Sequence, residues 1–188
     1  LSIGSETINK KVIYDFRTKY LSKLSKVSQG KQFVTDKMPH NFRFIPLICA
    51  AFPEAKIVHV RRNASAICWS NFKQCFVHTG LGYSHDLGDI VTYYHLYNEL
   101  IEFWQLQYGD RIYNLNYDSL TTDQEKQTRK LINHLELNWE DACLSPENNN
   151  RSVITSRHQV RNQVYKNSSK EWLKFEPYLN GIFDCLLP

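Results

Sequence analysis

Two side chains are spaced in the sequence so that they could bind an anion together. Arg62 follows the β-branched run at residues 56–60, Asn63 is a good helix N-cap, and Ser70 comes two turns later. Over those eight residues a helix rises roughly 12 Å, so an arginine lying along it could share a phosphate with the serine hydroxyl. The spacing predicts a phosphate-binding cradle; the alternative is a surface arginine beside a solvated serine.

Two more polar residues stand at the ends of predicted strands. Lys37 follows a short strand predicted at residues 32–35, and Tyr117 closes one predicted at 111–117. Ligands of parallel α/β sheets collect beyond the carboxyl ends of the strands, where helix N-termini also point. We therefore expect Lys37, Arg62 and Tyr117 at one ligand-binding edge.

The elements that must position these residues alternate between helix and strand. Amphipathic spacing predicts a helix from Ile13 to Val27 that ends at Gly30. The remaining predicted elements are helices at 41–52, 63–76, 86–108 and 168–185, a helix opened by a capping box at 122–125, and the strands at 32–35, 56–60 and 111–117. This order is typical of an α/β fold with a mostly parallel sheet. Three strands make a thin sheet, so we expect further strands outside this stretch.

Length and composition indicate one folded domain over residues 1–188. The chain is 42% hydrophobic and 22% charged, which excludes a disordered or fibrous protein. It has no apolar run long enough for a membrane span and no basic region before an apolar block at its start, so we expect neither a membrane span nor a secretion signal. The five cysteines form no metal-ligand spacing, so we expect free thiols, no metal and a reducing, cytoplasmic location. Since the first residue is not methionine, we expect a piece of a longer protein.

The positive charge is concentrated in two segments. Residues 1–31 carry a net charge of +5 and residues 151–174 again +5, whereas residues 32–150 carry −4. Such clustering suits an anionic ligand or partner, although a solvated basic face would look the same.

Four sequence blocks in this order resemble the sulfotransferases. They are Asp-Lys-Met-Pro at 36–39 with Asn41-Phe42, Phe-Pro-Glu-Ala-Lys-Ile-Val-His-Val-Arg-Arg-Asn at 52–63 with Ser70, Asn-Tyr-Asp-Ser-Leu at 116–120, and Ser-Arg-His-Gln-Val at 156–160 with Tyr165 and Trp172. The likeness is greatest to the tyrosylprotein sulfotransferases and to bacterial sulfotransferases that carry tetratricopeptide repeats. It implies a fold related to P-loop nucleoside-triphosphate-binding proteins, with a tetratricopeptide or other segment upstream in the parent chain.

The resemblance also implies a donor and roles for particular residues. The donor would be 3'-phosphoadenosine 5'-phosphosulfate, with 3',5'-bisphosphoadenosine as product and a hydroxyl-bearing acceptor. Lys37 and Ser156 would be catalytic, and Arg62 and Ser70 would hold the 3'-phosphate. The other implied nucleotide contacts are Tyr117, Ser156, Gln159, Val160, Tyr165 and Lys170.

The sequence departs from the family pattern in several places. The glycine-rich turn that binds the 5'-phosphosulfate is not in the sequence, so the resemblance implies a carboxyl-terminal part of the domain, with the catalytic base upstream of residue 1. His40 is an alternative base, and a surface histidine is the simpler reading. Glu171 and Gln74 stand where the tyrosylprotein enzymes have basic residues.

Two other functions are compatible with the basic segments. One is a module that binds a bisphosphorylated adenosine nucleotide without catalysis. The other is a nucleic-acid-binding domain, which would lose affinity steeply with added salt. The sequence favours neither, because the block at residues 36–39 and the spacing from Arg62 to Ser70 would be unexplained. We therefore expect no nucleic-acid partner. The missing apolar run predicts no membrane partner either.

Overall fold

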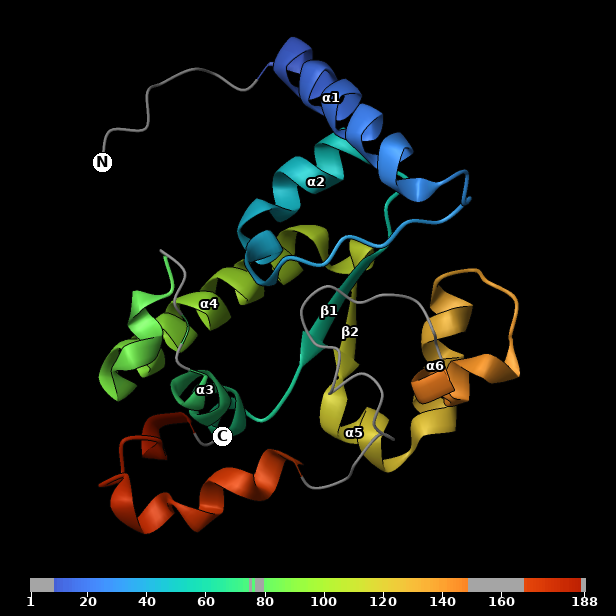
Figure 1. Ribbon diagram of the computed structural model, residues 1–188. Coiled ribbons are helices and arrows are strands. Elements are labelled where there is room, and N and C mark those ends of the chain that lie inside the picture. Colours follow the sequence, from blue (N-terminus) through green and yellow to red (C-terminus); the bar gives the residue numbers. More distant parts are fainter. Residues whose placement is uncertain (1–8, 75, 77–79, 149–167, 187–188) are drawn as a thin grey trace. The chain divides into compact units, whose positions relative to one another are not determined.

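The computed structural model describes residues 9–74, 76, 80–148 and 168–186 (Figure 1). These residues form two compact units. The first contains the described residues up to Ile57 together with Leu100–Arg111, and the second contains Val58–Glu99 and the described residues from Ile112 onward. The elements combine helices with a small parallel sheet, which confirms the predicted α/β class.

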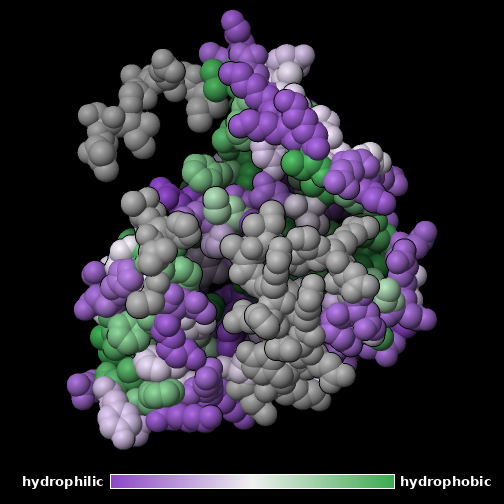
Figure 2. All heavy atoms as spheres, viewed as in Figure 1, coloured by the Kyte–Doolittle hydropathy of each residue, from purple (hydrophilic) through white to green (hydrophobic). Residues whose placement is uncertain are grey.

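The first unit begins with helix α1, Lys10–Ser28, close to its predicted bounds. The Asn9 side chain accepts a hydrogen bond from the backbone N–H of Val12 at 3.0 Å, and Gln29 ends the helix in a left-handed conformation. Phe16 and Tyr20 pack on the ring of Phe52, with centroids 5.9 and 5.0 Å away. The outward side of α1 is mainly hydrophilic, with apolar side chains between the lysines (Figure 2).

Two short helical elements replace the single helix predicted at 41–52. A 3-10 helix, η1, covers Pro39–Phe44, and the α-helix α2 covers Ile45–Ala51. Pro46 stands in the first turn of α2, where no intrahelical partner is lost by its missing N–H. Arg17 of α1 fixes the end of α2, because its guanidinium donates to the Ala51 carbonyl at 2.6 Å and pairs with Glu54 at 2.7 Å.

The strand predicted at residues 32–35 is wrong. The chain there is extended, but within the described residues no strand pairs with it, and the sheet contains only two strands. The side chains of Phe33 and Val34 are 64% and 42% exposed. β-branched and aromatic residues favour a strand only where a neighbouring strand accepts the backbone hydrogen bonds and covers one face.

The second unit is built around strands β1, Ile57–Arg61, and β2, Ile112–Asn116. Helix α3, Ala64–Lys73, follows β1, and the Asn63 side chain caps it by accepting from the N–H of Ala66 at 2.9 Å, as predicted. Helix α4, Leu87–Tyr108, and the short 3-10 helices Gly82–His85 and Gly109–Arg111 connect α3 to β2. Both of these strand predictions are confirmed.

The core of the second unit joins α3 and α4 to the carboxyl-terminal segment. Cys68 is fully buried at its centre, beside Ile90 and Val91 of α4. From the far end of the chain come Trp172, Leu179, Phe183 and Leu186, each at most 9% exposed. In Figure 1 the red carboxyl-terminal ribbon lies beside α3 accordingly.

The helix predicted at 168–185 is wrong. The segment forms three 3-10 helices, η6 at Ser168–Lys174, η7 at Glu176–Tyr178 and η8 at Asp184–Leu186. Pro177 lacks the N–H that a continuous α-helix would need. Asn180 and Gly181 then adopt positive φ of 49° and 71°, a left-handed conformation that does not continue a right-handed helix.

The predicted capping box at residues 122–125 is also wrong. Thr122 is instead the last residue of helix α5, Tyr117–Thr122, and its hydroxyl donates to the Asp118 carbonyl at 2.7 Å. Helix α6, Gln124–His134, starts after Asp123 without a side-chain cap. Two 3-10 helices, Asp141–Leu144 and Pro146–Asn148, follow it.

Cys49 and Cys68 are free thiols, as predicted, and both are buried. Burial raises the pKa of the Cys68 thiol to about 12, so this group is not reactive at neutral pH. None of the described helices is both long and apolar enough to cross a membrane.

A histidine links the two strands to α4. The ring of His59 in β1 donates through Nδ1 to Asn114 Oδ1 in β2 at 2.8 Å, and its Nε2 bonds the hydroxyl of Tyr97 in α4. Because an amide oxygen only accepts, Nδ1 carries the proton and Nε2 accepts from the tyrosine. Desolvation, with a smaller repulsion from Arg61, lowers the pKa of His59 below 6.5.

This histidine predicts acid-sensitive stability. Since the folded pKa lies below the unfolded one, the unfolded chain binds more protons, and the free energy of unfolding falls as pH drops below about 6.5. His59→Gln should flatten that part of the curve by up to about 1 kcal/mol. Urea titrations between pH 5 and 7.5 would measure it, with His95→Gln, an exposed histidine on α4, as control. Equal slopes in wild type and His59→Gln would contradict the assignment.

Candidate anion-binding site at the ends of two parallel strands

The parallel pairing of β1 and β2 brings their carboxyl ends to one edge of the sheet, as the sequence predicts. Arg62 comes directly after β1, and Tyr117 comes directly after β2 as the first residue of α5. The guanidinium carbon of Arg62 lies 5.5 Å from the centroid of the Tyr117 ring, a cation–π distance. The structure therefore brings together two of the predicted site residues that are 55 positions apart.

The Nε edge of the Arg62 guanidinium also forms a hydrogen bond. Its Nε–H donates to Ser169 Oγ of η6 at 2.8 Å. Arginine has five N–H donors, and the other four are on the two terminal nitrogens. Those two nitrogens can form an end-on bidentate contact with a phosphate or carboxylate.

A carboxylate lies behind this arginine–serine pair. Asp118 accepts a hydrogen bond from the Ser169 hydroxyl on Oδ1 and from the backbone N–H of Asn63 on Oδ2, at 3.0 Å for the latter. Asn63 is the N-cap of α3, so Asp118 also satisfies a backbone donor at the helix start. One side chain of α5 thus connects the start of α3 to the carboxyl-terminal segment.

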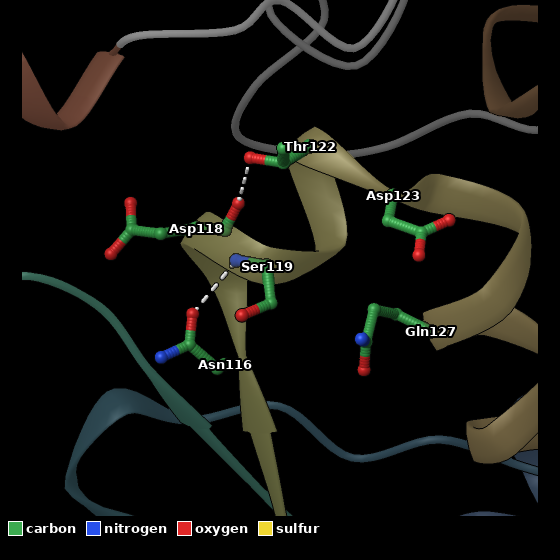
Figure 3. Close-up of a pocket in the computed structure, with 6 residues that line it drawn as sticks. All are labelled: Asn116, Asp118, Ser119, Thr122, Asp123 and Gln127. Carbon is green, nitrogen blue, oxygen red and sulfur yellow. Dashed lines mark hydrogen bonds between the residues drawn. The ribbon is translucent and has the colours of Figure 1, made fainter.

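Local capping determines where Asp118 stands. The Asn116 side chain accepts from the backbone N–H of Ser119 at 2.8 Å and so turns the chain from β2 into α5. An open pocket of about 450 Å³ lies beside this turn, lined by Asn116, Asp118, Ser119, Thr122, Asp123 and Gln127. Figure 3 shows the Asp118 carboxylate pointing away from Asp123 and Gln127. It belongs to the arginine network rather than to the far wall of the pocket.

Ser70 lies on α3, partly exposed, two turns beyond the start of the helix. Lys170 is exposed on η6, next to Ser169. Gln74 is exposed at the C-cap of α3. Ser156, Gln159, Val160 and Tyr165 lie outside the described residues.

Glu171, the acidic residue at a position where a lysine was expected, has a basic partner. Its carboxylate pairs with Lys73 at the end of α3, at 3.0 Å. The hydrogen bond from Lys73 lowers the pKa of Glu171 below its ordinary value. The tilted rings of Trp69 and Phe175, the residue directly after η6, also pack with centroids 4.6 Å apart, so this segment is held along α3 by charge and by packing.

Lys37 belongs to the first unit, within the exposed extended stretch that precedes η1. Its neighbour Asp36 accepts hydrogen bonds from the Tyr20 hydroxyl and, at 3.3 Å, from the Asn41 side chain. Desolvation and then Asp36 raise the pKa of Tyr20 to about 12. The backbone beside Lys37 is thus fastened to α1 and η1 while its ammonium group faces solvent. His40, at the start of η1, packs its ring edge on Phe42.

The sequence of the chain matches one known protein family over most of its length. The model of the sulfotransferase family matches residues 8–141, more than half of the chain. The chain belongs to the sulfotransferase family.

Similar proteins are found in Aquifex aeolicus and in two mycobacteria. A protein of Aquifex aeolicus, named only as uncharacterized, is 34% identical over 170 residues, which cover 89% of this chain and 22% of that protein. The omega-hydroxy-beta-dihydromenaquinone-9 sulfotransferases of Mycobacterium bovis and Mycobacterium tuberculosis are 31% identical over 117 residues, or 57% of this chain and 29% of each enzyme. This sulfotransferase chain therefore spans less than a third of the length of these relatives.

Sequence reasoning missed three residues that contact or adjoin predicted site residues, two in the second unit and one in the first. Asp118 directly follows Tyr117, and Asp36 directly precedes Lys37, so both lay inside the blocks already singled out. Their side-chain partners could not be read from those blocks. Ser169 gave no signal at all, because 107 residues separate it from Arg62 and it lies beyond the matched residues.

Proposed function

We propose that this chain contributes the 3'-phosphate-binding part of an enzyme that transfers a sulfuryl group from 3'-phosphoadenosine 5'-phosphosulfate to an acceptor hydroxyl. The observation that supports the proposal is the state of Arg62 at the sheet edge. Its face lies on Tyr117 and its Nε–H donates to Ser169, and among the described residues no hydrogen bond uses its two terminal nitrogens, which suit a doubly charged group. Because the chain belongs to the sulfotransferase family, we assign that group as the 3'-phosphate of the donor.

The remaining donor contacts are assigned by resemblance. Ser70 would donate to the same phosphate, Tyr117 would contact the nucleotide, and Lys170 would add positive charge. Ser156, Gln159, Val160 and Tyr165 would wrap the nucleotide, and the net charge of +5 over residues 151–174 suits that role.

Chemically, sulfuryl transfer is like phosphoryl transfer. The group moves in line from the bridging oxygen of the donor to the acceptor oxygen, so positioning and charge stabilisation provide most of the rate enhancement. Lys37 would place its ammonium near the bridging oxygen and stabilise the negative charge that develops on the departing 3',5'-bisphosphoadenosine. Ser156 would support the same transition state by hydrogen bonding. The acceptor hydroxyl gives up its proton to a base.

Replacement of Arg62 tests the nucleotide assignment. Arg62→Ala should weaken binding of 3',5'-bisphosphoadenosine about 10- to 100-fold, since loss of a hydrogen bond to a charged group costs about 1.5–3 kcal/mol. Calorimetry measures this, with Arg61→Ala as matched control because Arg61 is exposed at the end of β1. Unchanged affinity in Arg62→Ala would exclude the assignment. Tight, steeply salt-dependent binding of generic DNA or RNA would favour a nucleic-acid function instead.

Replacement of Lys37 tests the catalytic assignment. Lys37→Ala in the full-length protein should lower kcat about 100-fold or more and change donor affinity much less, because the lysine acts on charge that develops in the transition state. Release of 3',5'-bisphosphoadenosine reports turnover for any acceptor. Lys31→Ala, an exposed lysine in the same extended stretch, is the control. Equal losses in kcat and donor affinity would argue against the role, and nucleotide binding without turnover in wild type would indicate a non-catalytic module.

A further inference from the structure

Arg62 is also held by two residues that are not among the proposed nucleotide contacts, Ser169 directly and Asp118 through Ser169. We infer that Ser169 and Asp118 are positioning residues, which orient the Arg62 guanidinium so that its terminal nitrogens face an anionic ligand. This inference rests on the proposed function for the identity of that ligand as a 3'-phosphate. The contacts among the three side chains stand independently of it.

The hydrogen-bond directions follow from the chemistry of each group. Arg62 Nε–H can only donate, so Ser169 Oγ accepts it at 2.8 Å. The serine has one proton of its own, and Asp118 Oδ1 accepts it. The second carboxylate oxygen is occupied by the Asn63 N–H at 3.0 Å, which fixes the rotation of the carboxylate. In this series of hydrogen bonds, Ser169 therefore orients Arg62, Asp118 orients Ser169, and the Asn63 N–H orients Asp118.

The segment that carries Ser169 is anchored at two points. Ser169 lies in η6, three residues before the buried Trp172, whose ring packs on Phe183 at 5.8 Å. The ion pair between Glu171 and Lys73 holds the same segment to the end of α3. A side chain anchored on both sides in this way can limit the rotamers of the flexible arginine, and ordering a side chain before it binds lowers the entropy cost of binding.

The negative charge of Asp118 has a second effect. It lies one hydroxyl away from the guanidinium, so it balances the arginine charge in the free protein without occupying the terminal nitrogens. Asp118 and Arg62 do not form a direct ion pair among the described contacts. A ligand phosphate can therefore bind Arg62 without first displacing a carboxylate.

The first measurement needs no nucleotide. In the ¹H–¹⁵N spectrum of the arginine side chains, the Nε–H of Arg62, assigned by its loss in Arg62→Lys, should exchange with water about three- to tenfold faster in Ser169→Ala than in wild type. Ser169→Thr keeps the hydroxyl and should restore slow exchange. Ser168→Ala, the neighbouring serine of η6, should leave it unchanged. Equal exchange in wild type and Ser169→Ala would overturn the inference, whatever the ligand.

The second measurement connects this geometry to binding. Ser169→Ala should weaken binding of 3',5'-bisphosphoadenosine about three- to tenfold and leave adenosine 5'-phosphate, which has no 3'-phosphate, unaffected. Because both residues act through Arg62, adding Asp118→Asn to Ser169→Ala should cost little more affinity than the worse single variant. Equal losses for both nucleotides, or additive losses in the double variant, would overturn the positioning role. If wild type binds neither nucleotide, the proposed function fails, and the exchange measurement still decides the inference.

Discussion

The parallel pairing of β1 with β2 is the constraint on which the site depends. In an antiparallel pair the residues after the two strands would leave from opposite edges, but here Arg62 and Tyr117 leave from the same edge and meet. Each strand is followed at once by a helix whose start is capped by an asparagine, Asn63 or Asn116. The backbone therefore has little freedom at the points where the site residues emerge.

Much of this arrangement could be predicted from local sequence. The strands at 56–60 and 111–117 and the N-cap at Asn63 carry signals within a few residues of themselves, and the structure confirms all three. The strand predicted at 32–35 failed because its formation depends on a partner, which no local pattern of Phe33 and Val34 can supply. The helix prediction for the carboxyl-terminal segment failed for a different reason. Its apolar residues have helical spacing, but Pro177 and Gly181 divide the segment into short 3-10 helices.

In the candidate site, too, some residues could be predicted from local sequence, and others depend on partners far away in the sequence. The contact between Arg62 and Tyr117 could be predicted from the two strand ends, whereas the role of Ser70, taken from helical spacing, stays a prediction. The partners that orient Arg62 could not be predicted, since a hydrogen bond from a serine to an arginine has no sequence signature. In the first unit, the bond from Tyr20 to Asp36 was likewise outside any local pattern, although it fixes the backbone next to Lys37.

The contact between Arg62 and Ser169 closes a loop of 107 residues. During synthesis the chain emerges from its amino end, so β1, α3, α4 and β2 are all available to fold before the serine has been made. A chain that stops short of residue 169 would lack both the serine that accepts from Arg62 and the core residues Trp172, Leu179, Phe183 and Leu186. Completion of the carboxyl terminus therefore supplies the core of the second unit and the orientation of the arginine at the sheet edge in the same step.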